Sequence, residues 1–377
     1  MQTALYAILH MFVDGVCALA MFGWFAEGSE GYFNILLYNF CAFALQMPLG
    51  TMLDLQATKR MPGKSVVSLQ AKGQWTERLP YVYAAAGVVL TIIGALTHPV
   101  FLGIGNALFH VGGGVDVIRE DFANHWKGRA LGVFVAPGAL GLYVGSLVAK
   151  SDLLIRRGMI VILLGGIMFV VLALLALLLR TVKSKGNLAT VDGYVECKSE
   201  RGRCRGGNLE HGRMQVLILP VCCLLVVILR SYVGMAVSFP WKTTVMMGFL
   251  SVFAVVLGKM AGGFLAASLG MRKVMVFSLV VSAACFLLCK YAVFGIAAQF
   301  FFNMTMPVTL YMLVEHYRRL AGFAFGLLTF GLFLGFLPAY LEPGLQVPGA
   351  VTGCVGSLVS LILLFAALSF GQVKRDS

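Results

Sequence analysis

The sequence carries little charge for its length. Of its 377 residues, 12% are Asp, Glu, Lys or Arg, about half of the share found in soluble globular domains. Hydrophobic residues make up 59% of the chain, and the mean hydropathy is +0.89. Because so few charged groups cannot cover the surface of a soluble protein of this size, a water-soluble fold is excluded. We expect a protein that is solvated by lipid.

Three further absences narrow the possible classes. The apolar runs are continuous, so the period-two alternation that a membrane β-barrel requires is missing. No Gly-x-x-x-x-Gly-Lys-Ser/Thr loop is present, so we expect no ATP drive within this chain and no cofactor. A disulfide framework is not expected, because most cysteines lie in apolar segments, where cysteine behaves as a small hydrophobic residue. These are Cys17, Cys41, Cys222, Cys223, Cys285, Cys289 and Cys354.

Twelve apolar segments are long enough to cross the hydrocarbon core, which takes about 20 residues of helix. The first is expected to be a membrane span and not a signal peptide, because it is too long and lacks a charged lead and a cleavage site. The segments are 3–25, 31–53, 79–97, 99–119, 129–149, 158–180, 214–237, 243–266, 273–290, 292–315, 321–341 and 349–371. The sequence therefore predicts an all-α membrane protein with 12 transmembrane helices.

The distribution of Lys and Arg predicts the orientation. With the N-terminus inside, the even-to-odd loops and the C-terminal tail hold 22 basic residues, and the opposite loops hold five. Because basic residues collect in cytoplasmic loops, we expect a multi-pass protein of the cell membrane with both termini in the cytoplasm. The same loops account for the net charge of +13 without a nucleic-acid partner. The cluster Lys150, Arg156 and Arg157 runs against this rule.

The longest hydrophilic stretch divides the spans six and six. Residues 181–213 are rich in glycine and charge, as a flexible linker is. We therefore expect six-helix bundles at 1–180 and 214–377 with a cytoplasmic linker between them. The two cysteines and the histidine of this linker are too few for a structural zinc site, which takes four ligands, and no metal site is expected.

The two halves repeat. The fifth span begins "GRALGVFVAPGALGLYVG" and the eleventh "GFAFGLLTFGLFLGFLPA". At one fixed offset, Gly128, Ala130, Gly132 and Gly141 match Gly322, Ala324, Gly326 and Gly335. Small residues at such spacings let helix backbones approach closely. Since both spans enter from the same side, the repeat is parallel, and parallel six-helix halves that rock about a central site are one transporter design.

With this layout the sequence resembles the major facilitator superfamily, whose loop signature reads Gly-x-x-x-Asp, then Arg, Gly and a basic pair. In "GTMLDLQATKR", after the second span, the retained residues are Gly50, Asp54, Lys59 and Arg60. In "GFLAASLGMRK", after the eighth span, they are Gly263, Gly270, Arg272 and Lys273, with Ala267 where the Asp belongs. The resemblance implies two pseudo-symmetric bundles, alternating access by a monomer, and a cytoplasmic gate hinge at the retained charged residues.

A narrower likeness concerns two short stretches. "GIGNALFHVGGG" in the fourth span and "LRSYVGMAVSFP" in the seventh are similar to the fosmidomycin-resistance group of facilitators. That group is associated with drug efflux, so the resemblance implies export.

Polar side chains within the spans fall mainly on spans 1, 4, 7 and 10. They are His10 and Asp14, then Asn106, His110 and Asp116, then Arg230, then Gln299 and Asn303. A charge at the bilayer centre costs about 2.5–3.5 kcal/mol on insertion scales, so such groups face water or pair with one another. By resemblance, these four helices line the central cavity of the superfamily. We expect Asp14, His110 and Arg230 to reach one aqueous cavity near the midplane.

Proton coupling is assigned to Asp14, His10 and His110. A carboxylate beside a cation or a histidine in a low-dielectric cavity can bind and release a proton as the cavity opens to each side. The alternative for Asp14 is a permanent structural pair with His10 or with Arg230. The alternative for His110 is a hydrogen bond to a carbonyl beside the "VGGG" stretch.

Substrate binding is assigned to Arg230, Asn106 and Asn303. The planar guanidinium of arginine suits an anionic group, while the two asparagines are alternatively hydrogen-bonding contacts between helices. Lys259 in the eighth span is expected to extend its ammonium toward the membrane surface.

These assignments predict a secondary active transporter that is proton-coupled and carries a small organic anion or a drug-like compound, with efflux favoured. The expected partners are the small-molecule substrate, protons and membrane lipids. The alternatives are a nutrient-uptake symporter and a receptor or scaffold that keeps the fold without transport. An intramembrane enzyme is not expected, because the histidines and carboxylates within the spans are few.

Overall fold

The computed structural model describes residues 2–58, 66–151, 165–168, 171–172, 174–175, 209–342 and 347–372. Most of the expected sixth span and of the linker lies outside the described residues, as do Lys59, Arg60, Arg156 and Arg157. Within the described ranges the regular elements are helices, apart from one isolated bridge between Val237 and Val347.

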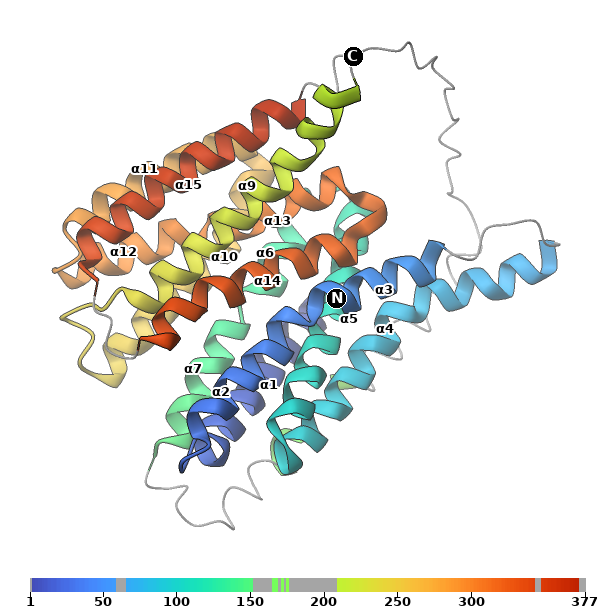
Figure 1. The fold of residues 1–377 in the computed structure, drawn as a ribbon, viewed down its shortest axis with the longest axis horizontal. Helices are drawn as coiled ribbons and strands as arrows, with labels where there is room; N and C mark the ends of the chain where they lie inside the picture. The colour runs from blue at the N-terminus through green and yellow to red at the C-terminus, as the bar shows by residue number, and fades with distance from the viewer. Residues whose placement is uncertain are drawn as a thin grey trace.

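The first half of the chain contributes the helices of one bundle (Figure 1). They are α1 (Gln2–Ala20), η1 (Met21–Phe25), α2 (Gly31–Asn39), η2 (Phe40–Ala44), α3 (Gln46–Thr58), α4 (Val66–Thr97), α5 (Pro99–Ala123), α6 (Arg129–Val135) and α7 (Gly138–Ala149). The first span is therefore α1 with the π-helical η1, the second runs from α2 through η2 to α3, and the fifth is divided between α6 and α7.

The second half contributes the other bundle. Its helices are α9 (Leu209–Ala236), α10 (Val245–Leu269), α11 (Met271–Leu287), α12 (Ala292–Asn303), α13 (Thr305–His316), η4 (Arg318–Leu320), α14 (Ala321–Leu341) and α15 (Gly349–Gln372). Ten described segments are long and apolar enough to cross a membrane. The helix α11, with 17 residues, overlaps the ninth predicted span, 273–290, without matching its ends. The helix α9 begins at Leu209, within the stretch expected to be linker.

Short turns with ordinary capping chemistry join many of these helices. The side chain of His98 accepts a hydrogen bond from Val100 N at 3.2 Å, and Pro99 occupies the first position of α5, where a missing N–H costs nothing. The Thr244 hydroxyl accepts from Met247 N at 3.2 Å at the start of α10. Gly270 ends α10 with φ of 94°, a value that glycine adopts readily.

We call the two ends of the molecule, along the direction of the helices, the terminal face and the opposite face. The terminal face holds the start of α1, marked N near the centre of Figure 1, and the end of α15, near the top of that view, and the opposite face holds the loop between η1 and α2. The backbone N–H and hydroxyl of Thr3 both donate to Glu120, which joins the start of α1 to the end of α5. The first span therefore runs antiparallel to the fourth.

The repeated glycines bring the two bundles together near the terminal face. A Cβ added to Gly326 of α14 would lie 2.4 Å from Met47 Cα of α3. At the matching place in the first bundle, a Cβ on Gly132 of α6 would lie 3.2 Å from Gly263 Cα of α10. The absence of a Cβ allows the close approach at Gly326 and eases the tight one at Gly132, so matching positions in the two halves each pack against the other bundle.

Candidate functional site

A cavity of about 430 Å³ lies between the two bundles, and helices of both line it. Apolar side chains make up most of its wall. Besides Tyr38 of α2, the ionisable residues that line it are His10 and Asp14 of α1, His110 of α5, Arg230 of α9 and Lys259 of α10. The structure thus places Asp14, His110 and Arg230, expected from sequence to share one cavity, at the same cavity.

The terminal face is closed by contacts between the bundles. Asp54 at the end of α3 accepts hydrogen bonds from Gly322 N at 3.1 Å and Phe323 N at 2.8 Å, so it caps the N-terminus of α14 across the interface. The rings of Phe122 and Tyr311 stack at 5.2 Å between α5 and α13. The bundles cannot part at this face without separating these groups.

Side-chain contacts also join the bundles at the opposite face. The rings of Tyr32 and Tyr340 stack at 4.3 Å, and the hydroxyl of each donates to the backbone carbonyl of the other. The Tyr143 hydroxyl donates to Val245 O at 2.8 Å. We call the pair of Tyr32 and Tyr340 the tyrosine clasp. The cavity extends from the helix midpoints toward this clasp, since its wall includes Ile35 and the half-exposed Met235.

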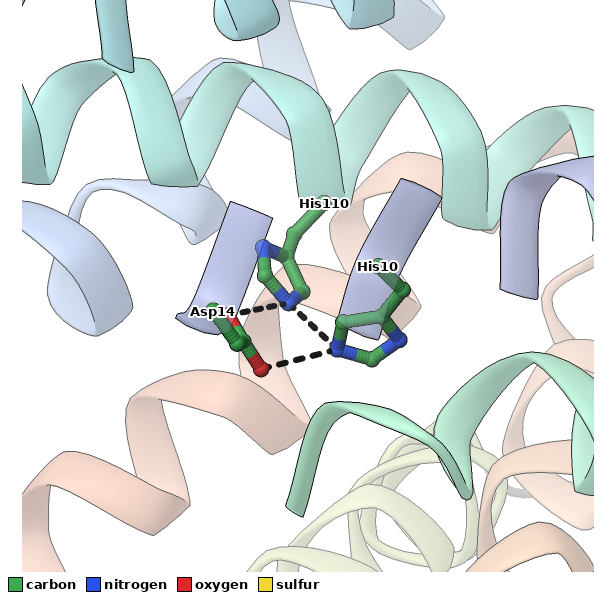
Figure 2. A group of neighbouring side chains, drawn as sticks. All are labelled: His10, Asp14 and His110. Atoms are coloured by element: carbon green, nitrogen blue, oxygen red, sulfur yellow. Dashed lines mark hydrogen bonds and ion pairs between the residues drawn. The ribbon is translucent and has the colours of Figure 1, made fainter. Parts of the chain in front are cut away.

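Three titratable side chains form a compact cluster in the cavity wall (Figure 2). The two Nε2 atoms of His10 and His110 are 2.8 Å apart. Asp14 faces both rings, with Oδ2 3.2 Å from His10 Nε2 and Oδ1 3.6 Å from His110 Nε2. All three residues are buried. His10 and Asp14 lie one turn apart on α1, which is why their side chains meet.

Backbone carbonyls fix the orientation of both imidazoles. His10 Nδ1 lies 2.7 Å from Phe134 O, and His110 Nδ1 lies 2.9 Å from Asn106 O. Because a carbonyl oxygen only accepts, each Nδ1 must carry a hydrogen, and in a neutral ring Nε2 then has none. Two neutral rings would direct their lone pairs at each other and at Asp14. One hydrogen placed between the Nε2 atoms relieves this repulsion, so the geometry suits a single proton shared by the two histidines.

The same three residues offer a possible metal site. One donor atom from each lies within 4.8 Å of the others. Zinc bonds of about 2.0–2.1 Å in a tetrahedron would hold two nitrogens roughly 3.3 Å apart. The observed 2.8 Å between the Nε2 atoms is shorter and matches a hydrogen bond. The donor spacing therefore fits a proton better than a metal ion.

Asn106 lies behind Asp14 and not on the cavity wall. Its Nδ2 donates to Asp14 Oδ1 at 2.9 Å and contacts Cys17 Sγ at 3.5 Å. Its Oδ1 has no hydrogen-bond partner among the described atoms. Asn106 was predicted to bind substrate, but its place in the structure suits it to orient the carboxylate.

Two cations face the cavity from the second bundle. Arg230 is 6% exposed, and its Nη1 donates to Thr305 Oγ1 at 3.5 Å. Lys259 Nζ donates to Val135 O at 3.3 Å. Neither has a carboxylate within ion-pair distance in the described part of the chain. The prediction that Lys259 extends to the membrane surface is wrong, because the cavity and the carbonyl of Val135 provide its ammonium with an acceptor inside the protein.

The remaining predicted residues lie away from the cavity. Asn303 donates to Gln299 O of its own helix at 2.9 Å and does not line the cavity. Arg272 lies 5.5 Å over the ring of Phe365, a contact within the second bundle, and Lys273 is exposed beside it. Among the predicted gate residues whose side chains the structure describes, Asp54 is the one that hydrogen-bonds to the other bundle.

Several cavity residues were missed at the sequence level. Gln46 lines the cavity while its Oε1 has no partner among the described atoms, although its Nε2 donates to Ala42 O at 2.6 Å. Tyr32 and Tyr340 gave no signal beyond being aromatic residues near span ends. The dipeptide Pro137–Gly138 is a common mark of a helix break, and it lies within the segment 129–149 predicted as one continuous span.

Solved structures similar to this chain are transporters. A structure of the major facilitator superfamily transporter FucP in the outward conformation has a TM-score of 0.53 and 12% identity, covering 97% of this chain and 98% of that chain. The E. coli fucose:proton symporter FucP has a TM-score of 0.52 and 11% identity, with 97% of both chains covered. The human organic anion transporter MFSD10 has a TM-score of 0.57 and 12% identity, covering 97% and 99%.

No protein-family model and no curated protein matches the sequence. At such low identity the structural likeness concerns the fold alone, and it extends over nearly the whole chain. The predicted fold class is confirmed: the chain is an all-α, multi-pass membrane protein with the fold of the major facilitator superfamily transporters.

Proposed function

We propose that this protein is a proton-coupled secondary transporter that carries an organic anion by alternating access. The observation that supports it most directly is the composition of one cavity. A histidine pair suited to a shared proton faces it from one bundle, and two cations without carboxylate partners among the described residues face it from the other. The fold, common to transporters, supplies the rocking bundles.

The cluster links proton release to movement. With the shared proton, the histidine pair is a cation next to the carboxylate of Asp14. Without it, two lone pairs and a negative charge face one another within 3.6 Å. This arrangement is unstable in a site of low dielectric constant. Loss of the proton therefore favours separation of the two rings, and α1 and α5 must adjust to allow it.

The two cations define the class of substrate. Arg230 offers a planar fork of donors and Lys259 a compact ammonium, and a buried cation is stabilised by an anion placed beside it. The rest of the wall, such as Met21, Ile35 and Leu332, is apolar. The cavity therefore suits an anion whose charged group meets Arg230 and Lys259 and whose apolar part lies toward the opposite face.

Charge balance favours binding of the proton and the anion together. The shared proton adds one positive charge to a cavity that holds Arg230, Lys259 and one carboxylate, so it strengthens the attraction for an anion. Under an inward proton gradient, such co-transport is uptake. Export, which the likeness to the fosmidomycin-resistance group favours, requires the proton and the anion to exclude each other. We propose co-transport, by a monomer in the cell membrane with both termini in the cytoplasm.

The test uses purified protein in proteoliposomes and a series of aryl and alkyl sulfonates led by benzenesulfonate. A sulfonate stays a monoanion at every pH used, so any proton that moves is moved by the protein. We expect sulfonate flux driven by an imposed pH gradient, and no flux of phenyltrimethylammonium, a cation of similar size. The Asp14→Asn variant should lose the pH-driven flux, whereas Glu30→Gln, at an exposed loop carboxylate, should keep it.

Two outcomes contradict the proposal. Full pH-driven flux in the Asp14→Asn variant would remove the proton site from the mechanism. Saturable sulfonate binding without any flux or exchange would instead identify a receptor that kept the transporter fold.

A further inference from the structure

The fifth span is broken at a place that touches both the proton cluster and the anion site. The helix α6 ends at Val135 and α7 begins at Gly138, with Ala136 and Pro137 between them. Proline has no backbone N–H and cannot continue the hydrogen-bonding pattern of the preceding turn. The last carbonyl groups of a helix lack partners within it, so those at the end of α6 are available to other groups.

Side chains from both bundles take two of these carbonyls. Phe134 O accepts from His10 Nδ1 at 2.7 Å, and Val135 O lies 3.3 Å from Lys259 Nζ. Adjacent carbonyls of one helix end thus hold a histidine of the proton cluster and a lysine of the anion site. The first contact also fixes the hydrogen of His10 on Nδ1, which leaves Nε2 facing His110.

The two sides of the break are attached to different parts of the protein. On the α6 side, a Cβ at Gly132 would lie 3.0 Å from Lys259 O of α10, in the other bundle. On the α7 side, a Cβ at Gly141 would lie 2.0 Å from Met11 O, and one at Gly145 2.2 Å from Gly15 O, both of α1. Thus α6 is packed against the second bundle and α7 against the helix that carries His10 and Asp14.

The first residue of α7 also lies against the cluster itself. A Cβ on Gly138 would be 2.3 Å from His10 Nε2 and 2.5 Å from Asp14 Oδ2. Real Cβ atoms do not approach this closely, so only glycine lets α7 start here while the imidazole keeps its place.

We propose that the break at Ala136–Pro137 couples the proton site to the anion site. It acts as a positioning element, because its carbonyls hold His10 and Lys259 together while the terminal face is closed. When α6 and α10 separate to open that face, the two acceptors cannot stay with both side chains. Val135 O then leaves Lys259, while Phe134 O stays with His10 of its own bundle, so the anion site and the proton site move apart in one movement. The inference rests on the proposed function and adds the residues that tie the two binding events together.

The decisive variant is Pro137→Ala, which restores a backbone N–H and favours a continuous helix without altering a charged group. In proteoliposomes with benzenesulfonate, we expect the number of protons moved per sulfonate to fall at least fivefold. Sulfonate counterflow, which needs no net proton movement, should remain measurable, so that the ratio of protons to sulfonate can be compared with that of the wild type. The matched control is Pro220→Ala, because Pro220 lies within α9, which continues through it.

A second variant covers the case in which Pro137→Ala does not fold. Gly138→Ala adds no backbone donor and displaces the His10 ring directly, so it should give the same loss of protons per sulfonate. Its control is Gly23→Ala, where the nearest atom to an added Cβ, Ala149 Cβ, is 3.9 Å away. If folded Pro137→Ala or Gly138→Ala protein keeps the wild-type ratio, the inference is wrong while the proposed function stands. If the wild type itself moves no protons with sulfonate, both fail.

Discussion

Nε2 of His10 lies 2.8 Å from Nε2 of His110, and each ring is held from behind by a backbone carbonyl at its Nδ1 atom. A ring flip would break the carbonyl contact and place a carbon against the other imidazole. The pair therefore has one favourable arrangement, and it needs one hydrogen between the rings. The number of hydrogens on the two imidazoles follows from their hydrogen-bond partners alone.

The first prediction concerns this pair. Replacing His110 by Asn leaves a single imidazole beside Asp14, and no second nitrogen remains to share the proton. We expect the pH change evoked by benzenesulfonate in proteoliposomes to disappear while the protein still folds and exchanges sulfonate. His98→Asn is the control, because His98 is an exposed cap of α5 and Asn also caps helices well. A normal proton signal from His110→Asn would exclude the shared-proton model.

The second prediction concerns the two cations. Hydrogen bonds to charged groups contribute about 1.5–3 kcal/mol, which corresponds to roughly 10- to 150-fold in affinity. Arg230→Gln and Lys259→Gln should each raise the KM for benzenesulfonate by a factor in this range. Lys290→Gln, at an exposed lysine that lies over the ring of Tyr291, should leave KM unchanged. An unchanged KM in both cavity variants would mean that the anion binds elsewhere.

The third prediction is the sign of the pH effect on binding. A proton on the histidine pair adds a positive charge to the cavity that receives the anion, so its gain raises affinity and its loss lowers it. We expect the Kd for benzenesulfonate, measured by calorimetry on detergent-purified protein, to be lower at acidic than at alkaline pH, and to change little with pH in Asp14→Asn. The other titratable side chains at the cluster are Cys17 and Tyr38. A Kd that rises on acidification would favour proton–anion exchange and export.

The spans and the central polar residues were predictable because the hydrocarbon core requires spanning helices to be apolar, so polar exceptions stand out in the sequence. Helices that cross a membrane must be long and apolar, and each charge among them carries a free-energy cost, so Asp14 and Arg230 stood out in the sequence. Hydropathy does not indicate the direction in which a side chain points. It could not tell that Lys259 points into the cavity, since its long side chain could equally have reached the surface.

Other features depend on tertiary partners that no local pattern reveals. Asn106 and Asn303 look alike in the sequence, yet one orients a carboxylate and the other bonds to its own helix. The tyrosine clasp requires the start of α2 and the end of α14 to meet across the bundles. The break at Pro137 was visible as a dipeptide, but its meaning comes from His10 and Lys259, which reach it from two other helices.

The fourth prediction tests the orientation inferred from the basic loops. Ser29 is exposed at the opposite face and Asn124 at the terminal face. In intact cells, a membrane-impermeant maleimide should label a Ser29→Cys variant, and it should label Asn124→Cys only after permeabilisation. Both are made in a background in which the native cysteines are replaced. The reverse labelling pattern would place the termini outside and would contradict the distribution of Lys and Arg.

The last prediction concerns closure of the terminal face. Asp54 accepts two backbone N–H groups at the start of α14, and an amide in its place offers only one oxygen. Loss of a cap costs about 0.5–2 kcal/mol, which shifts the balance between closed and open forms by roughly 2- to 30-fold. A cysteine at Met306, on the cavity wall, should therefore react faster with a maleimide applied from the terminal face in Asp54→Asn protein. Thr51→Ala is the control, because Thr51 lies one turn earlier on α3 and bonds to Met47 O of its own helix. Equal labelling rates in the Asp54→Asn and Thr51→Ala proteins would show that the glycine contacts alone keep this face closed.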